Sequence, residues 1–254
     1  MSRGAHLAIA LVLVWLPAGS VSAQTAEHDP WEKWNRRIFW FNDRVDVYVL
    51  EPAARAWHAV LPDRVERAIG NFFRNLRVPS VAVNDLLQGK PRATGTDLLR
   101  FAVNTSVGIA GFFDPASHWG IPEREEDVGQ TLGRWGVPPG PYVVLPFVGP
   151  SNPRDAVGLV GDWALTIYPF FVDRFVTLGV NTVQVVNRRA ELLDEVRNAK
   201  KASFDYYAFA RNAYIQRRAT LVADRPSAVT DEEELYYFEE EDWEEGPSEG
   251  ANGE

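Results

Sequence analysis

Two carboxylates and a glycine form a polar stripe in an apolar part of this chain. Asp155, Gly158 and Asp162 recur at a spacing of about 3.6 residues, so they share one face of a helix that Asn152 can cap and Pro153 can begin. Small and acidic residues on one face leave room for water and for polar groups. The alternative is structural: Asp155 favours the dipole of the first helical turn, and Asp162 faces solvent. The spacing alone leaves both interpretations open.

The residues that most often perform catalysis do not assemble into a recognisable site. His6 lies in the N-terminal apolar segment, His28 precedes the first predicted helix, and His58 and His118 are isolated from each other. The chain has no Cys, no G-x-S-x-G or H-E-x-x-H pattern, and no glycine-rich loop that ends in a Lys. We therefore expect no enzyme activity, no cofactor and no metal site.

An acidic cluster formed by Glu123, Glu125, Glu126 and Asp127 follows Pro122. Four carboxylates close together could attract a cation. Acidic residues are also common at a helix start, where they favour the dipole. The second interpretation, in which the cluster decorates a loop or a helix start, is the simpler one.

Glycine and proline are concentrated between Asp127 and Asp155, which excludes a long regular helix from this segment. The segment is nevertheless apolar, unlike a solvated linker. A rigid, apolar loop suits an element that lies against lipid or gates an apolar passage; the alternative is a buried crossover loop. The residues concerned are Gly129, Gly133, Trp135, Gly136, Gly140, Tyr142 and the aliphatic run Val143–Leu145.

Several segments resemble one known family, in the same order and spacing. GQTLGRWGVPPGPYVVLPFVGPSNPRD, which begins at Gly129, resembles the central motif of the MlaA (VacJ) family of outer-membrane phospholipid-transport proteins. DPWEKWNRRIFWFND at Asp29–Asp43 resembles the opening segment of that family. Three further matches are NFFRNLRVPSVAVNDLLQGK at Asn71–Lys90, RFAVNTSVGIAGFFD at Arg100–Asp114 and YYAFARNAYIQRR at Tyr206–Arg218.

The resemblance implies a mainly α fold, in which amphipathic helices form a single ring-like bundle with a Gly/Pro-rich hairpin loop. Family members lie in the inner leaflet of the outer membrane, associate with porin trimers and carry a central amphipathic channel. They remove mislocalised phospholipids from the outer leaflet and pass them to a periplasmic carrier protein.

For individual residues, the resemblance favours the passage-lining interpretation of Asp155, Gly158 and Asp162. It makes four glycines the hinge points of the hairpin loop and two aromatic residues its apolar surface. The glycines are Gly129, Gly133, Gly136 and Gly140, and the aromatic residues are Trp135 and Tyr142.

Residues 1–23 are typical of a secretory signal peptide, with Arg3, a short apolar core, and Val21, Ser22 and Ala23 before the cleavage point. Family members are usually lipoproteins anchored through a Cys at that point. This chain has no Cys, so we expect it to be exported but not lipidated. Its own apolar surface must then hold it at the membrane. The alternative is a soluble periplasmic lipid-binding or scaffold protein.

Charge is segregated along the chain. The segment 231–254 holds 12 Asp and Glu and no Lys or Arg, which predicts a solvated, disordered tail. The body, residues 24–230, carries 25 basic and 23 acidic residues, and we expect one helical domain there. With basic and acidic residues balanced in this way, nucleic-acid binding is not expected.

The rest of the chain predicts helices, with starts at Pro52 and Pro62. Val78–Leu87 and Arg92–Asn104 predict two more, and Arg188–Val222 predicts a long one that breaks near Ser203. Tyr142–Val148 is the one candidate for a strand. Val157–Val186 is apolar, but charges and Pro169 argue against a transmembrane helix.

Overall fold

The computed structural model describes residues 29–166 and 168–225 and is mainly α-helical. The predicted signal peptide and the predicted acidic tail lie outside the described residues. The helices are α1 Glu32–Val45, α2 Glu51–Val60, α3 Asp63–Leu87, α4 Pro91–Ser106, α5 Pro115–His118, α6 Val128–Arg134, α7 Pro153–Leu165, α8 Arg174–Glu191, α9 Leu193–Ala202 and α10 Tyr206–Val222. A π-helical turn, η1 Asp46–Leu50, joins α1 to α2, and a 3-10 turn, η2 Tyr168–Phe170, lies between α7 and α8. Strands β1 Val143–Leu145 and β2 Gly149–Ser151 form an antiparallel hairpin.

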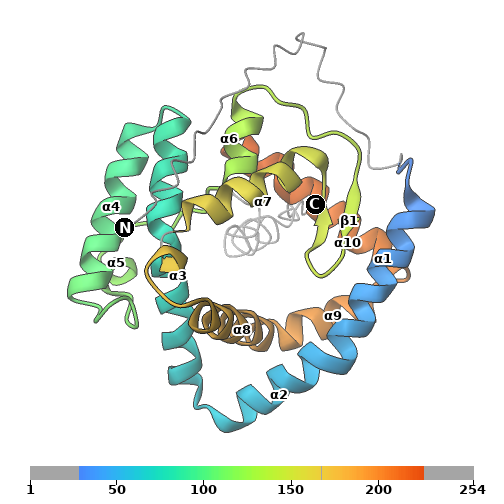
Figure 1. Ribbon diagram of the computed structural model, residues 1–254, viewed down its shortest axis with the longest axis horizontal. Helices are drawn as coiled ribbons and strands as arrows, with labels where there is room; N and C mark the ends of the chain where they lie inside the picture. The colour runs from blue at the N-terminus through green and yellow to red at the C-terminus, as the bar shows by residue number, and fades with distance from the viewer. Residues whose placement is uncertain (1–28, 167, 226–254) are drawn as a thin grey trace, which may run out of the picture.

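These elements are arranged as a ring (Figure 1). Helix α1 packs on β1, while α10 packs on β2 and on α6. The ring continues through contacts of α6 with α3, of α3 with α8, and of α8 with α2. Helix α4 packs along α3 on the outside of the ring. Within the described chain, no helix combines the length and the apolar character needed to cross a bilayer.

The N-terminal ends of α1 and α10 meet and close the ring. Arg36 of α1 donates a hydrogen bond to Asp205, the residue that caps α10, at an Nη2–Oδ2 distance of 2.6 Å. The Tyr207 hydroxyl of α10 donates to Asp29, just before α1. The ring of Phe39 packs against Tyr207 with its centroid 5.4 Å away. Ring closure therefore rests on one aromatic cluster and two polar contacts.

Two asparagines of α1 hold the hairpin in place. The side chain of Asn35 is fully buried; its Nδ2 donates to the Tyr142 carbonyl at 3.1 Å and its Oδ1 accepts from the Val144 amide at 2.9 Å. Two turns further along α1, Asn42 donates to the Leu145 carbonyl at 2.9 Å and accepts from the Phe147 amide at 2.8 Å. Each side-chain amide thus satisfies one backbone carbonyl and one backbone N–H group of the hairpin.

Several local predictions are confirmed. The Asn152 side chain accepts from the Asp155 amide at 2.9 Å and caps α7, which begins at Pro153. The predicted strand is one arm of the hairpin, and the predicted break near Ser203 separates α9 from α10.

Two predicted helix boundaries are wrong. A helix was expected to begin at Val78, but α3 runs without interruption through Pro79. The long helical pattern from Arg188 is also divided a second time, at Leu192 between α8 and α9. Pro79 removes one backbone hydrogen bond, yet Val78, Val81 and Ala82 are buried around it, and that packing keeps α3 continuous.

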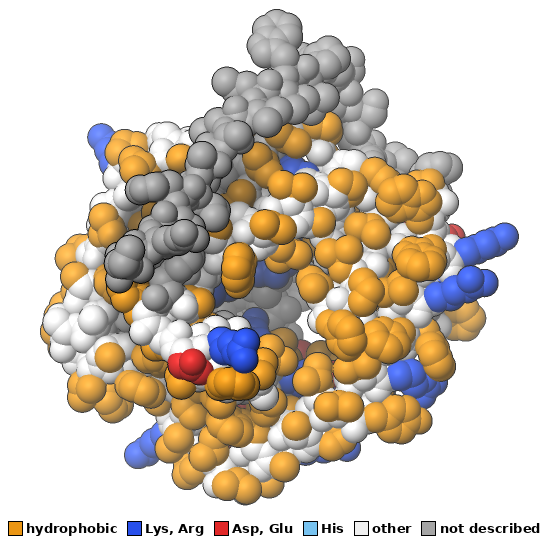
Figure 2. Space-filling model, in the orientation of Figure 1, with side chains coloured by type: hydrophobic (Ala, Val, Ile, Leu, Met, Phe, Trp, Pro, Cys, Tyr) orange, Lys and Arg blue, Asp and Glu red, His pale blue; other side chains and the backbone are white. Residues whose placement is uncertain are grey.

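Burial is inverted relative to an ordinary soluble domain. Among the described residues, 10 hydrophobic side chains are buried, against 16 polar or charged ones. Large aromatic side chains are exposed instead, and hydrophobic side chains cover much of the face shown in Figure 2. The exposed aromatic residues include Trp31, Trp34, Trp40, Phe113, Trp119, Phe147, Trp163, Phe171, Phe175 and Phe204. Water disfavours such an exterior, whereas a bilayer favours it.

Candidate functional site

Two adjoining cavities lie along the inner side of α3. Cavity A, of about 180 Å³, lies between α3, α4, α8 and the segment before α6, and cavity B, of about 290 Å³, lies between α3, α7, η2 and α8. Four residues line both cavities, and we call these four the junction: Phe73, Arg77 and Val81 of α3, and Gln184 of α8. The space-filling view shows a hollow in the middle of this face, with basic side chains inside it (Figure 2).

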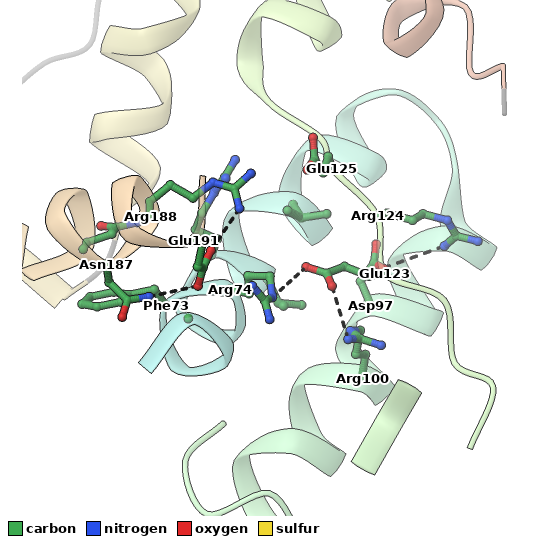
Figure 3. Close-up of a pocket in the computed structure, with 15 residues that line it drawn as sticks. Phe73, Arg74, Asp97, Arg100, Glu123, Arg124, Glu125, Asn187, Arg188 and Glu191 are labelled. Carbon is green, nitrogen blue, oxygen red and sulfur yellow. Dashed lines mark hydrogen bonds and ion pairs between the residues drawn. The ribbon is translucent and has the colours of Figure 1, made fainter. Parts of the chain in front are cut away.

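Cavity A is lined by ion pairs. Glu123 lies between two arginines, with carboxylate oxygens 3.7 Å from Arg74 Nε and 3.6 Å from Arg100 Nη2 (Figure 3). On another wall, the Arg188 and Glu191 side chains pair at 3.0 Å. Such a wall keeps the cavity hydrated and suits a charged or zwitterionic group.

Arg77 differs from the other arginines of cavity A. Arg74, Arg100, Arg124 and Arg188 each pair with a carboxylate. Within the described part of the chain, no ion pair or hydrogen bond engages Arg77. The one guanidinium left without a partner is thus the one that lies at the junction.

Cavity B combines apolar walls with a carboxylate. Leu76, Leu159 and Trp163 supply apolar surface, and Asp162 lines the same cavity. The Asp162 Oδ1 accepts a hydrogen bond from the Val128 amide at 2.9 Å. Burial raises the pKa of Asp162 to about 6, because desolvation disfavours the charged form and outweighs this hydrogen bond. Asp162 therefore takes up a proton at a higher pH than an ordinary aspartate does.

Asp155, the first residue of the predicted stripe, lies in a buried network and lines neither cavity. Arg218 of α10 bridges two carboxylates: its Nη1 is 2.5 Å from Asp127 Oδ2, and its Nη2 is 2.9 Å from Asp155 Oδ1. Burial alone would raise the pKa of Asp155, but the Tyr214 hydroxyl and the Arg218 guanidinium outweigh it and hold the pKa below the usual value. Asp155 therefore ties α7 to α10.

The glycines of the Gly/Pro segment serve two different purposes. Gly158 of α7 lies against Gly129 of α6, and Gly133 lies against Arg154 and Val222, so small residues allow close approach at these positions. Gly129 and Gly133 are thus inside α6, not at hinges of a loop as expected. Gly136 and Gly140 have φ angles of +90° and +72°, which favour glycine at these two turns.

The two aromatic residues assigned to the hairpin surface are placed differently from each other. Trp135 is exposed, and its Nε1 donates to the Leu87 carbonyl at 3.0 Å. Tyr142 is buried against Val144 and Tyr207, in the cluster that closes the ring. Trp135 thus presents apolar surface, whereas Tyr142 belongs to the interior.

The two described histidines, His58 and His118, and the acidic cluster have structural partners. His58 Nδ1 lies 2.9 Å from Glu66 Oε2, and His118 Nδ1 lies 3.0 Å from the Asp114 carbonyl. In the acidic cluster, Glu126 accepts from Lys90 at 2.9 Å, and Asp127 caps α6 through the Gln130 amide at 2.7 Å. Over residues 29–166 and 168–225, no group of three or more His, Asp or Glu is placed to hold a metal ion.

Sequence reasoning missed Arg77 and Gln184. The available signal was the helical stripe Phe73, Arg77 and Val81, in which a cation interrupts an otherwise apolar face at a spacing of four residues. Among the expected lining residues, the structure places Asp162 in cavity B and places Asp155 and Gly158 where α7 meets its neighbours.

Comparisons with known proteins agree on one family. The family model described as MlaA lipoprotein matches residues 27–221. The "Intermembrane phospholipid transport system lipoprotein MlaA" of Shigella flexneri is 37% identical over 221 residues, 85% of this chain and 86% of the relative. An uncharacterised protein of Rickettsia felis is 35% identical over 77% of this chain and 78% of its own length.

A solved structure gives the same result. It is described as "Structural basis for maintenance of bacterial outer membrane lipid asymmetry", and it matches with a TM-score of 0.67 and 36% identity. The match covers 77% of this chain and 99% of the solved chain. The ring of amphipathic helices and the Gly/Pro hairpin are therefore shared in sequence and in fold, and this chain belongs to the MlaA lipoprotein family.

Proposed function

We propose that this protein removes mislocalised phospholipids from the outer leaflet of the outer membrane and passes them through its ring to a periplasmic carrier protein. The observation that carries the proposal is the inverted burial: a pair of cavities lined by charged side chains inside a ring whose outside is apolar. The names of the MlaA relatives, which refer to intermembrane phospholipid transport, support it.

A phospholipid in transit needs two environments at once. Its headgroup is costly to strip of water unless polar groups replace that water, whereas its acyl chains need apolar walls. Cavity A supplies ion pairs, and cavity B supplies Leu76, Leu159 and Trp163 beside Asp162. Transfer along this route breaks no covalent bond, so the protein acts as a transporter and not as an enzyme.

The exterior of the ring supports a position in the inner leaflet of the outer membrane. Each Å² of apolar surface removed from water contributes about 25 cal/mol, so exposed residues such as Trp40, Phe113 and Phe171 favour insertion. This surface holds the protein at the membrane without an acylated Cys. A porin trimer supplies the adjoining partner in the membrane, and the carrier collects lipid on the periplasmic side.

The test measures phospholipid exposed on the outer leaflet of intact cells. Deletion of the gene should raise this exposure, and the wild-type protein should restore it. We expect Asp162→Leu to fail in restoring it, because an apolar side chain replaces the carboxylate of cavity B. Asp194→Leu is the matched control, since Asp194 lies on the exposed side of α9.

Two results would reject the proposal. Unchanged phospholipid exposure in the deletion strain would exclude the transport function. Recovery of untreated protein only in the soluble periplasmic extract would replace it with the soluble lipid-binding alternative.

A further inference from the structure

Arg77 places a guanidinium without a described partner where the two cavities meet. Arg77 lines both cavities, is exposed to them, and has neither an ion pair nor a hydrogen bond with any described residue. Every other arginine of cavity A is neutralised by a neighbouring carboxylate. The net attraction for an anion in cavity A is therefore concentrated at Arg77.

The groups around Arg77 match one kind of anion. The Gln184 side-chain amide, on α8, lines both cavities as well and is free of hydrogen bonds to other described residues. A planar guanidinium beside an amide can give several N–H donors to the oxygens of a phosphate. Phe73 and Val81 complete the junction with apolar surface, which suits the carbon atoms esterified to that phosphate.

We propose that the junction binds the phosphodiester of a passing phospholipid, with Arg77 as its principal contact and Gln184 as a second donor. The inference rests on the proposed transport function and adds to it the place where the headgroup is held. The lipid stops with its phosphate between the cavities, beside the apolar surface of Phe73 and Val81.

The charges of cavity B extend the inference to the class of headgroup. Asp162 lines cavity B together with Arg77, so a carboxylate and a guanidinium face the same space. The other carboxylate of cavity B, Glu126, already accepts hydrogen bonds from Lys90 and Gln88. Asp162 accepts the hydrogen bond of the Val128 amide through Oδ1 alone, so its Oδ2 is the carboxylate oxygen left for an ammonium group. A zwitterionic headgroup with a phosphate and an ammonium, such as phosphatidylethanolamine, fits both charges better than phosphatidylglycerol does.

The experiment uses the full-length protein in detergent and phospholipids that carry a photoactivatable group on an acyl chain near the glycerol. After irradiation, mass spectrometry measures the yield of lipid adduct on the peptides of α3, α7 and α8 that line the cavities. We expect Arg77→Glu to lower the phosphatidylethanolamine adduct by about tenfold or more, the effect of losing charge-assisted hydrogen bonds. Arg77→Gln removes the positive charge without reversing it, and it should also lower the yield of this adduct.

Arg67→Glu is the matched control. Arg67 is an exposed residue of α3 that lines neither cavity, and the control makes the same change of charge on the same helix. It should leave the adduct yield unchanged. Circular dichroism and the thermal unfolding midpoint establish that each variant is folded; if Arg77→Glu is not, Arg77→Gln decides.

Comparisons among ligands test the headgroup. Wild-type protein should give more adduct with phosphatidylethanolamine than with phosphatidylglycerol, and Arg77→Glu should leave the adduct of a phosphate-free diacylglycerol unchanged. If Arg77→Glu lowers the diacylglycerol adduct as much as the phosphatidylethanolamine adduct, the phosphate contact is refuted. Binding of inorganic phosphate at Arg77 without any lipid adduct would overturn the lipid as the ligand.

Failure of this inference is distinguishable from failure of the proposed function. If Arg77→Glu gives a wild-type adduct yield and restores lipid asymmetry in cells, the junction site is refuted while transport stands. If the wild-type protein gives no adduct and its deletion leaves outer-leaflet phospholipid unchanged, the transport function itself is refuted.

Discussion

Gly158 of α7 lies directly on the backbone of Gly129 in α6. A Cβ atom at Gly158 would come within 2.5 Å of the Gly129 amide nitrogen and 2.7 Å of its Cα, distances that force a backbone to move. The contact joins the helix that carries Asp162 to the helix whose amide binds it, at Val128. The position of the cavity B carboxylate thus depends on two residues without side chains.

Substitution of Gly158 should therefore separate α6 from α7. We expect Gly158→Ala to lower the free energy of unfolding by about 1–3 kcal/mol, the usual cost of forcing atoms into a packed contact. Thermal and denaturant unfolding of the purified protein measure it. Gly179→Ala in α8 is the control: nothing lies within 4 Å of its added Cβ, so it should stabilise by about 0.5–1 kcal/mol. A stable Gly158→Ala variant would contradict the close contact.

Arg218 is expected to be essential for stability, because it neutralises both Asp127 and Asp155. Arg218→Met leaves the half-buried Asp127 without a cation and leaves Asp155 with Arg154 alone, and it should cost about 3 kcal/mol at neutral pH. The neighbouring Arg217→Met is the control, since the Arg217 side chain is 65% exposed and that of Arg218 is 14% exposed. Its ion pair with Glu125 should be worth about 0–1 kcal/mol. Urea unfolding of both variants checks the difference.

The same network predicts how stability changes in acid. The pKa values of Asp127 and Asp155 are held below the usual value, because Arg218 and nearby hydrogen bonds outweigh burial. A carboxyl group whose pKa is lower in the folded protein stabilises the fold above its ordinary pKa of about 4. This stabilisation is lost as the pH falls through the folded-state pKa. Wild-type protein should therefore lose stability below about pH 4. The Arg218→Met variant should lose less stability than wild type over that pH range. An equal loss of stability in the variant and in wild type would contradict the role of Arg218 in this network.

Asp162 has the opposite dependence on pH. Its pKa is raised to about 6 by burial, so its contribution to stability is present below the ordinary pKa and is lost as the pH rises through 6. Asp162→Asn keeps an oxygen for the Val128 amide and removes the charge. The variant should unfold at a higher temperature than wild type at pH 8, with the difference disappearing below about pH 4. A constant difference between pH 4 and pH 8 would show that Asp162 does not titrate in this window.

The hydrogen bonds between the Asn35 side chain and the hairpin can be tested directly. Asn35→Ala leaves the Val144 amide and the Tyr142 carbonyl without the partners they have in a fully buried position. The cost should be about 1–3 kcal/mol for each buried group left unsatisfied. Hydrogen–deuterium exchange of the Val144 amide should accelerate strongly. Asn212→Ala in α10, whose side chain accepts a hydrogen bond from the adjacent Arg211, should leave that exchange unchanged.

Features set by neighbouring residues were predictable from the sequence. The cap at Asn152 and the turns at Gly136 and Gly140 depend on local backbone chemistry, and all three occur where the sequence indicates them. The family motifs identified the ring, since several of them occur in the right order. The continuity of α3 across Pro79 was not predictable from the sequence. It depends on packing between α3 and α4, and residues next to Pro79 in the sequence do not indicate that packing.

The lining of the cavities could be predicted only in part. Spacing correctly places Asp155, Gly158 and Asp162 on one side of α7, but spacing does not say what covers that side. Helix α6 covers Gly158, and α10 reaches Asp155 through Arg218, which leaves Asp162 at the cavity. Arg77 was missed because an arginine in an amphipathic helix is ordinarily a solvated residue, and its role depends on its having no ion pair or hydrogen bond with another described residue.

The closure of the ring by Arg36 and Asp205 bears on the order in which the protein is made. These residues are 169 positions apart, and Asp29 and Tyr207 are 178 positions apart. The partners of α1 in α10 are therefore synthesised only when nearly the whole described chain has been made. Contacts this distant in sequence form slowly. Until α10 is made, the unjoined α1 and hairpin expose apolar surface to water. The nascent chain thus has its greatest need of a chaperone in the interval before its last helix is delivered.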